Sequence, residues 1–321
     1  MRALVAGGAG FVGSHLCDAL LARGFEVICA DNLVTGKRRN ITHLTANPLF
    51  HFLEHDVCTP LDLQVDWIFH LASPASPPQY LRMPIATLLV NSVGTQHLLD
   101  LATRNHARFL LASTSEIYGD PEVHPQVESY RGSVSSVGPR SCYDEGKRFA
   151  EALTMAYFRE HDTDVRIIRI FNTYGPRLDP ADGRVISNFL TQALRSQPLT
   201  MYGSGEQTRS FCYISDLIAG ILAVMENTST RADPINLGNP MEITLNELRK
   251  VLQELLHTSL PVTWHPLPTD DPHRRQPDIT KARRLLNWEP RVPLQEGLTA
   301  TLQWYREYIR NGDEVVNAPG H

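Results

Sequence analysis

Short apolar runs alternate with segments of helical periodicity through the first half of the chain. Runs of four to seven residues are typical of strands buried on both faces of a parallel sheet, and apolar positions that recur every three or four residues indicate amphipathic helices. The predicted strands are Ala3–Ala6, Glu26–Ala30, Leu49–Leu53, Trp67–Leu71, Phe109–Ser113 and Val165–Phe171. The predicted helices are Gly13–Arg23, Ile85–Asn105 and Tyr143–His161. This alternation predicts an α/β fold with a Rossmann-like, doubly wound parallel sheet.

The second half is less regular and predicts a smaller, mostly C-terminal lobe. An apolar run at Pro234–Leu237, preceded by a helical segment at Ile214–Glu226, would add one more strand to the sheet. We therefore expect a first domain over residues 1–171, to which residues near 210–239 return, and a second lobe over residues 172–321. Ligands in open α/β sheets bind at the carboxyl ends of the strands, where we expect the second lobe to lie. Its loops are marked by prolines: Pro261, Pro266, Pro268, Pro272 and Pro277.

The composition of the chain limits the classes of ligand that we expect and indicates a cellular compartment. The 321 residues carry a formal net charge of -5, which gives no electrostatic reason to expect nucleic acid or an anionic membrane as partner. Any anionic ligand must therefore be met by local positive groups. No apolar run is long enough for a membrane span. The five cysteines are odd in number and form no CxxC pair, which favours a reducing, cytoplasmic compartment.

Histidines and acids do not indicate a metal site. His51 and His55 are four residues apart, but the segment around them is predicted as a strand that runs into a loop, so the two rings would not share a helical face. We expect no bound metal.

A glycine-rich loop follows the first predicted strand and opens the first helix. In Gly7-Gly8-Ala9-Gly10-Phe11-Val12-Gly13, Gly7 permits a tight turn, Gly10 lets a pyrophosphate approach the backbone amides, and Gly13 permits close packing of helix on strand. A lone glycine motif is weak evidence. Here the strand–loop–helix context is right, and Asp31 ends the second strand some twenty residues on, as the dinucleotide fingerprint requires.

Asp31 favours NAD over NADP, because a carboxylate accepts hydrogen bonds from a ribose 2′-hydroxyl and repels a 2′-phosphate. The three cations Lys37, Arg38 and Arg39 could argue for NADP, but we interpret them as charges on a loop or helix surface. Asp56 and Val57, after the third strand, are expected to cap the adenine. Leu71, Ala72 and Ser73, after the fourth, are expected to line the nicotinamide half.

Tyr143 and Lys147 lie four residues apart on a strongly helical segment, so they share one face. They follow Ser113-Thr114-Ser115-Glu116 by about thirty residues, and both segments can converge on the nicotinamide. Oxidation of a hydroxyl needs a base, and a tyrosine base near pH 7 needs its pKa lowered from about 10 to about 7, or about 4 kcal/mol. The Lys147 ammonium and the positive nicotinamide ring can stabilise the phenolate, and Thr114 can hydrogen-bond the same hydroxyl.

With these residues identified, the sequence closely resembles the UDP-glucuronate decarboxylase (UDP-xylose synthase) family, within the extended short-chain dehydrogenases. The glycine loop, Tyr143 and Lys147 mark only the superfamily, whereas the SPASPP, TSE, DGRVxSNF and RxPD blocks are more specific. The resemblance spans nearly the whole chain and is carried by Gly7–Leu16, Leu71–Pro78, Leu110–Pro125, Gly138–Arg148, Ile170–Arg177, Asp182–Phe189, Tyr202–Arg209 and Asp270–Ile279.

The resemblance implies conversion of UDP-glucuronate to UDP-xylose and CO2, with NAD reduced and re-oxidised in the site. It implies that arginines and asparagines hold the diphosphate, namely Arg184, Arg209, Arg275, Asn172 and Asn188, and that Tyr202 packs on the uracil. Glu116 and Ser115 would position the sugar, and Arg275 would assist protonation at carbon 5. We add as substrate positions Tyr80, Val185 and Gln207, and as cofactor positions Phe11, Val12, Asn32, Thr35 and Gly36. A homodimer through helices around Val90–Asn105 and Tyr143–Arg159 is expected on the same ground.

One departure from the family and several alternatives stay open. Leu89 stands where the family usually has a lysine near the cofactor, which suggests weaker cofactor retention. Ser115 occupies the place where a 4,6-dehydratase carries an acid, and a 4-epimerase usually lacks the glutamate at 116. An enzyme that decarboxylates UDP-glucuronate and releases the 4-keto pentose keeps both residues and is the hardest to exclude. A silent NAD-binding regulator typically loses the tyrosine or the lysine.

Overall fold

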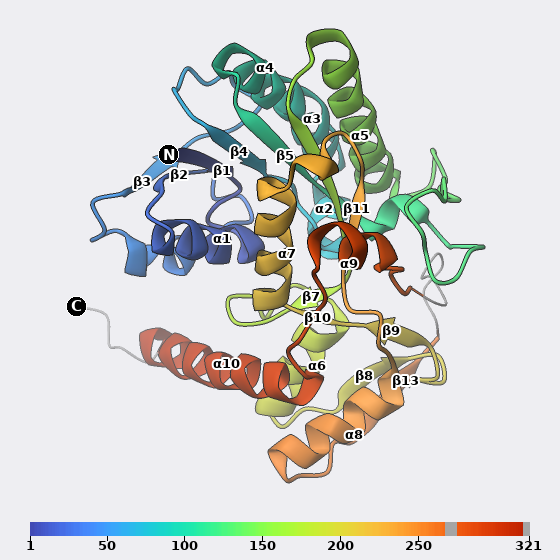
Figure 1. Cartoon of the computed structure of the whole chain (residues 1–321). Helices are drawn as coiled ribbons and strands as arrows, with labels where there is room; N and C mark the ends of the chain where they lie inside the picture. The colour runs from blue at the N-terminus through green and yellow to red at the C-terminus, as the bar shows by residue number, and fades with distance from the viewer. Residues whose placement is uncertain (267–274, 317–321) are drawn as a thin grey trace.

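The computed structural model describes residues 1–266 and 275–316, and a seven-stranded parallel sheet lies at their centre (Figure 1). The strand order is β11-β6-β5-β4-β1-β2-β3, so the chain winds outward from β1 in both directions. The strands are β1 (Arg2–Ala6), β2 (Glu26–Asp31), β3 (Phe50–Glu54), β4 (Trp67–His70), β5 (Arg108–Thr114), β6 (Val165–Ile170) and β11 (Ile235–Leu237). The predicted doubly wound α/β fold is confirmed, and each predicted strand begins and ends within one residue of the observed one.

Helices cover both faces of this sheet. One face carries α1 (Phe11–Ala22) and α7 (Ile214–Glu226), which pack on each other, and the other carries α4 (Thr95–Asn105) and α5 (Ser141–His161). Successive strand residues serve opposite faces, because Ala3 and Val5 belong to the first core and Leu4 and Ala6 to the second. Burial on both faces explains why the strands are continuous apolar runs.

The predicted helix Ile85–Asn105 is divided into three parts. Helix α3 (Pro84–Leu89) passes through a π-helical turn, η3 (Val90–Gly94), into α4. Around this turn, side chains hydrogen-bond carbonyl oxygens four residues back: Asn91 Nδ2 to Thr87 O at 2.8 Å, and Thr95 Oγ1 to Asn91 O at 2.9 Å. Such bonds compete with the backbone hydrogen bonds of a helix and distort it. The apolar spacing of the segment stays helical through the turn, so periodicity alone did not predict the interruption.

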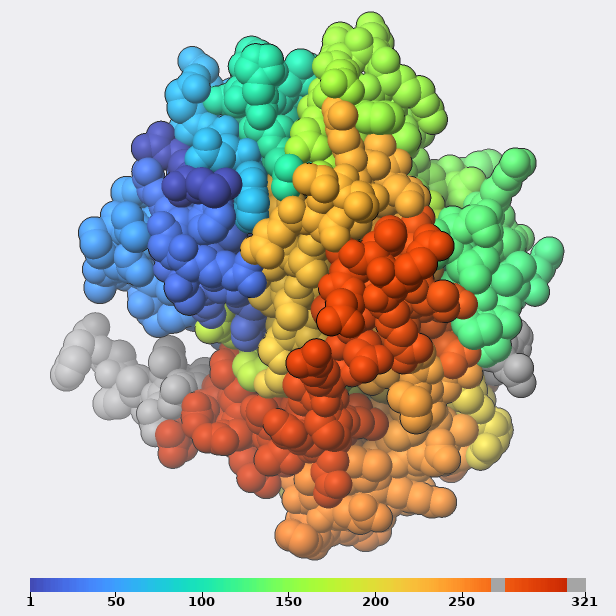
Figure 2. Space-filling view, in the orientation of Figure 1, coloured from blue at the N-terminus to red at the C-terminus, as the bar shows by residue number. Residues whose placement is uncertain are grey.

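The remaining elements build a second lobe with its own core, which occupies the lower part of the molecule in Figures 1 and 2. Its apolar side chains come from α6, β8, α8 and α10, with Leu190, Leu199, Leu248 and Leu302 at the centre. The elements are β7 (Thr173–Tyr174), α6 (Val185–Leu194), β8 (Leu199–Tyr202), β9 (Thr208–Ser210), β10 (Cys212–Tyr213), β12 (Glu242–Thr244), α8 (Leu245–Leu256), β13 (Val262–His265) and α10 (Leu294–Val316).

Short elements complete the chain. They are η1 (Arg38–Asn40), η2 (Thr42–Leu44), α2 (Pro77–Arg82), η4 (Ser115–Tyr118), η5 (Thr228–Thr230) and α9 (Thr280–Leu286). Late in the chain α9 packs against α7 and β11, and Trp288 Nε1 donates to Asp216 O at 2.9 Å, so residues near 280–288 also contact the sheet domain. Pro268 and Pro272 of the proline-rich stretch lie outside the described residues. No helix in the described ranges is both long and apolar enough to cross a bilayer.

Candidate active site

A cavity of about 890 Å³ lies between the carboxyl ends of the strands and the second lobe. This is the upper end of the size range of small-molecule sites. Among the described residues, eight basic and five acidic side chains line it, so the cavity is positive within an acidic protein. They are Lys37, Arg39, Arg140, Lys147, Arg177, Arg184, Arg209 and Arg275, and Asp31, Asp56, Glu116, Asp179 and Asp182.

The glycine loop forms one wall of the cavity and leaves no room for side chains. Gly7 has a φ of +81°, and a Cβ there would lie 2.7 Å from the backbone nitrogen of Ala72. A Cβ on Gly13 would lie only 2.1 Å from the carbonyl oxygen of Gly7. Gly10 stands at the N-terminus of α1, where free backbone amides and the helix dipole favour an anion. The turn, the close packing and the exposed amides that a pyrophosphate needs are all present.

Asp31 ends β2 beside this loop and is almost fully buried. Its carboxylate accepts hydrogen bonds from the backbone nitrogens of Ala9 (3.0 Å) and Leu33 (2.8 Å). Burial raises the pKa of Asp31, and the two hydrogen bonds act in the opposite direction. Gly36, which we assigned to the cofactor, is close to this carboxylate, and a Cβ there would lie 2.6 Å from both Asp31 oxygens. The loop therefore has no room for a side chain at this position, and contact of Gly36 with the cofactor stays a prediction.

The positions assigned to the adenine and nicotinamide halves also line the cavity. Asp56 accepts a hydrogen bond from Asn32 Nδ2 (3.1 Å) and one from the backbone nitrogen of Cys58 (2.9 Å). Burial would raise the pKa of Asp56, but these hydrogen bonds outweigh it and the pKa is lowered. The cavity wall further includes Phe11, Val12, Thr35, Val57, Leu71, Ala72 and Ser73.

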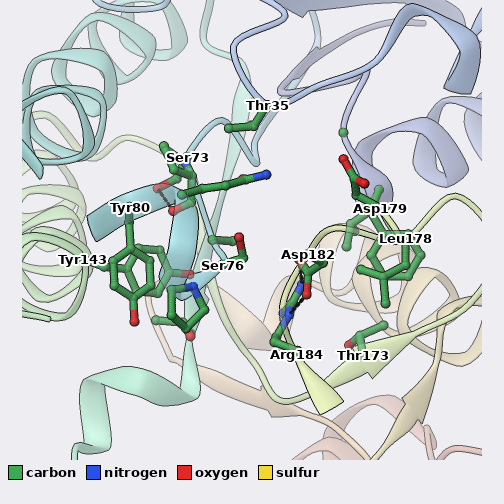
Figure 3. Close-up of a pocket in the computed structure, with 18 of the residues that line it drawn as sticks. Thr35, Ser73, Ser76, Tyr80, Tyr143, Thr173, Leu178, Asp179, Asp182 and Arg184 are labelled. Atoms are coloured by element: carbon green, nitrogen blue, oxygen red, sulfur yellow. Dashed lines mark hydrogen bonds and ion pairs between the residues drawn. The ribbon is translucent and has the colours of Figure 1, made fainter. Parts of the chain in front are cut away.

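Tyr143 and Lys147 project from α5 toward the end of β5. The ring of Tyr143 stacks on that of Tyr80, with centroids 5.0 Å apart and planes inclined by 3° (Figure 3). Lys147 Nζ donates to the carbonyl oxygen of Ala112 at 2.9 Å and lies 5.9 Å from the centre of the Tyr143 ring. Burial raises the pKa of Tyr143, and a hydrogen bond with Thr114 acts in the opposite direction. Burial also lowers the pKa of Lys147 to about 7, against the pull of Glu151.

Glu116 follows β5 in the short helix η4, and two arginines bracket its carboxylate. Arg140 binds one oxygen and Arg275 the other. Burial would raise the pKa of Glu116, but the two guanidinium groups outweigh it and the pKa is lowered. Arg275 is 6% exposed, and its Nε has no hydrogen-bond partner among the described residues. Residues 270–274 of the motif that contains Arg275 lie outside the described residues.

The other substrate positions come from the second lobe and line the same cavity: Asn172, Arg184, Val185, Asn188, Tyr202, Gln207 and Arg209. Arg184 precedes α6 and binds Asp182 through two hydrogen bonds of 2.5 and 2.9 Å (Figure 3). Gln207 Nε2 donates to Tyr202 O at 2.7 Å, which fixes the loop between β8 and β9. Tyr202 is 40% exposed, and its predicted packing on the uracil stays a prediction.

Sequence reasoning missed four charged residues that line the cavity, Arg140, Arg177, Asp179 and Asp182, and the buried Asp144 beside Tyr143. It also interpreted Lys37 and Arg39 as surface charges, whereas both line the cavity. Arg140 stands three residues before Tyr143 in a segment that was already singled out, and Asp182 two residues before Arg184, so spacing offered a signal for both. Asp144 is buried beside Tyr143, and its Oδ1 has no partner among the described residues. Burial, followed by the charge of Glu116, raises the pKa of Asp144 to about 7.

The chain belongs to the NAD dependent epimerase/dehydratase family, which matches residues 3–238. Within this family it is similar to UDP-glucuronic acid decarboxylase 1 of Arabidopsis thaliana, with 54% identity over 98% of this chain and 72% of that protein. UDP-glucuronic acid decarboxylase 1 of Xenopus tropicalis is 52% identical over 97% of this chain and 73% of that protein. The predicted resemblance is therefore confirmed.

Solved structures of enzymes that act on nucleotide sugars share the fold. The UDP-glucuronic acid 4-epimerase of Bacillus cereus, in complex with UDP-glucuronic acid and NAD, has a TM-score of 0.88 at 30% identity, over 96% of this chain and 100% of that one. The dTDP-glucose 4,6-dehydratase of Streptomyces venezuelae, with NAD bound, has a TM-score of 0.86 at 30% identity, over 96% and 97%.

Proposed function

We propose that this protein converts UDP-glucuronate to UDP-xylose and CO2, with NAD held in the cavity and restored in each turnover. The observation that carries the proposal is the identity of 52–54% to UDP-glucuronic acid decarboxylases over nearly the whole chain. The placement of Tyr143, Glu116 and Arg275 in one cavity supports it. The basic lining suits a substrate that carries both a diphosphate and a carboxylate.

The two lobes are proposed to divide the ligands. Residues 1–171, with the strand and helix near 210–239, would form the NAD-binding domain, and residues 172–321 most of the UDP-sugar site. The walls around Gly7, Gly13 and Asp31 fit NAD, because the first two exclude side chains and the third presents a carboxylate where a ribose belongs. Bound NAD would accept a hydride from carbon 4 of the sugar and return it at the end of the reaction.

Tyr143 is proposed to take the proton of the carbon 4 hydroxyl. Burial raises the pKa of Tyr143 above its ordinary value, so the phenolate needs the stabilisation that we expect from the Lys147 ammonium and the positive nicotinamide ring together. Lys147 is buried and donates to a backbone carbonyl. Positive charge beside the ring favours the phenolate, so the nicotinamide ring of bound NAD would help to lower the pKa of Tyr143. Thr114 would orient the reacting hydroxyl.

The ketone formed at carbon 4 is β to the carboxylate, so departing CO2 leaves its electron pair in a stabilised enolate. A proton must then be added at carbon 5. Glu116 and Arg275 are proposed to act there, with Ser115 helping to hold the sugar. The two arginines keep the pKa of Glu116 low, so Glu116 would position the sugar or a water as an anion, and the cationic Arg275 would assist proton delivery.

Product analysis discriminates the alternatives. Incubation with UDP-glucuronate and NAD should yield UDP-xylose and one CO2 per substrate consumed, with no net NADH. Accumulation of UDP-4-keto-pentose with an equal amount of NADH would indicate the oxidative decarboxylase instead. The similarity to the Bacillus cereus 4-epimerase makes a carboxylate-retaining isomer the other outcome to monitor by mass. Binding of NAD without turnover of any UDP-sugar would indicate a regulatory protein.

We propose a homodimer through the helices around Val90–Asn105 and Tyr143–Arg159, with α3, which directly precedes the first of them, as part of the same face. These helices pack on each other, and their apolar side chains Ile85, Leu88 and Phe149 are 74%, 42% and 51% exposed. Apolar side chains exposed on helices that pack together are suited to burial in an interface. Light scattering should give twice the mass of the chain. A Phe149→Glu variant should be monomeric, whereas an equal replacement at exposed Met241, far along the chain in the second lobe, should leave the dimer intact.

We also infer a cytoplasmic location. All five cysteines are free thiols in the structure, and four of them are buried. Free cysteines without a disulfide framework are typical of proteins kept in reducing compartments. Alkylation of the unfolded protein without prior reduction should label five thiols per chain.

A further inference from the structure

Three consecutive cations follow β2, the strand that ends at Asp31. Positive side chains at this place are typical of enzymes that bind NADP. Lys37, Arg38 and Arg39 come directly after Gly36, where an added Cβ would lie 2.6 Å from the Asp31 oxygens. Arginine and lysine at this place in the fold serve a ribose 2′-phosphate. The loop is fixed, because the backbone nitrogen of Lys37 donates to Ala9 O at 3.0 Å in the glycine loop. The question is why these cations do not make an NADP enzyme.

Each of the three side chains is already engaged. Arg38 binds Glu54 at the end of β3, and its guanidinium lies 4.8 Å from the centre of the Phe52 ring, so it is held within the sheet domain. Lys37 and Arg39 line the cavity, and their partners come from the second lobe instead. Lys37 Nζ lies 3.8 Å from Asp179 Oδ2, and the Arg39 guanidinium stacks 3.9 Å above the centre of the Tyr308 ring.

The partners are themselves well placed. Asp179 lies in the loop before α6, lines the cavity, and its other oxygen accepts a hydrogen bond from the backbone nitrogen of Ala181 at 3.0 Å. Figure 3 shows Asp179 and Thr35 on one side of the cavity and Tyr80 and Tyr143 on the other. Tyr308 belongs to α10, which runs beneath α1 in Figure 1. The second lobe thus reaches the cofactor loop at two points that are remote in sequence.

We propose that the second lobe helps to set cofactor specificity, because Asp179 and Tyr308 hold Lys37 and Arg39 away from a ribose 2′-phosphate. The inference rests on the proposed binding of NAD. Asp31 supplies the favourable contact to a 2′-hydroxyl. The two second-lobe residues bind the cations that would otherwise bind a 2′-phosphate. The preference for NAD over NADP is then set by residues of both lobes and not by the Asp31 loop alone.

Calorimetry of NAD and NADP binding to the full chain tests the proposal. Asp179→Asn keeps the oxygen that accepts from Ala181 but removes the charge that engages Lys37, so NADP affinity should rise by up to about fivefold, because one partly exposed ion pair is worth at most about 1 kcal/mol. NAD affinity should change less than about twofold on the same reasoning. Tyr308→Leu, which frees Arg39, should act in the same direction. Glu54→Gln is the matched control, because it frees Arg38 outside the cavity and should leave both affinities unchanged.

Repeating the Asp179→Asn measurement in a Lys37→Met chain tells whether Asp179 acts by holding Lys37 or by repelling the 2′-phosphate directly. If Asp179 acts by holding Lys37, then Asp179→Asn should have almost no effect on NADP affinity in a Lys37→Met chain. An undiminished effect there would mean that Asp179 merely repels the phosphate through space, and the inference would be wrong. It would also be overturned if neither Asp179→Asn nor Tyr308→Leu raised NADP affinity in folded protein, as judged by an unchanged thermal transition. Failure of the unmodified chain to bind NAD would contradict the proposed function instead.

Discussion

Replacement of Tyr143 by phenylalanine separates the chemistry of this residue from its packing. The ring is 5% exposed and stacks on Tyr80 in nearly parallel planes, and phenylalanine fills the same space. Loss of the hydrogen bond with Thr114 should cost about 0.5–1.5 kcal/mol of stability, partly offset because one less hydroxyl is buried. Turnover should fall by roughly 10²–10⁴, because the proton acceptor is gone, and this equals about 3–5 kcal/mol of barrier. Fold and NAD affinity should survive while catalysis does not.

The assay is CO2 release from UDP-glucuronate at saturating NAD, with thermal unfolding and NAD calorimetry on the same samples. Tyr118→Phe provides the matched control. Tyr118 is a buried tyrosine outside the cavity wall, and its hydroxyl donates to Asn236 Oδ1 at 2.8 Å, so its loss should lower stability more than turnover. A Tyr143→Phe enzyme with a near-normal rate would refute the assignment of Tyr143 as the base. A rate loss that merely follows unfolding would refute the separation of chemistry from packing.

Three further predictions address the cofactor loop, the carboxylate and acid stability. Gly13→Ala should abolish NAD binding in calorimetry, because the new Cβ would meet the Gly7 carbonyl at 2.1 Å; retained affinity would contradict the observed loop geometry. Glu116→Gln should lower kcat without weakening UDP-glucuronate binding, because the neighbouring arginines remain, and parallel losses of both would argue for a binding role. Burial, then the charge of Lys147, lowers the pKa of His70 to about 3. The unfolded chain therefore takes up this proton near pH 6.5 and the folded chain does not, so the free energy of unfolding falls as the pH drops from about 6.5 toward 3. Denaturant titrations should show a shallower decline for His70→Gln, and an identical decline would disprove the role of this residue.

Local pattern was sufficient for the sheet and for the cofactor loop. Strands such as Val165–Ile170 are buried on both faces and therefore appear as uninterrupted apolar runs. Tyr143 and Lys147 could be placed together because four residues span one helical turn. The lack of room for a side chain at Gly36 could not be predicted, because the atoms in the way belong to Asp31, which the fold brings near. The structural elements remain more predictable than their contacts.

Contacts between the two lobes could not be predicted from the sequence either, because only the fold brings the contacting residues together. Lys37 and Asp179 are separated by 142 residues, and the local composition of neither segment predicts the ion pair between them. Arg275 could be assigned only through the resemblance. Its ion pair with Glu116 joins residues that are 159 positions apart in the sequence. The π-helical turn at Val90–Gly94 was missed because the side-chain hydrogen bonds around it come from residues that still fit the helical periodicity.

The most direct test of the central claim is the reaction with UDP-glucuronate in D2O, followed by proton NMR and mass spectrometry of the product. If the carboxylate leaves from carbon 5 and a solvent proton replaces it, the product is UDP-xylose with one deuterium at carbon 5 and CO2 is released in equal amount. A product that retains the carboxylate, with or without inversion at carbon 4, would contradict the account.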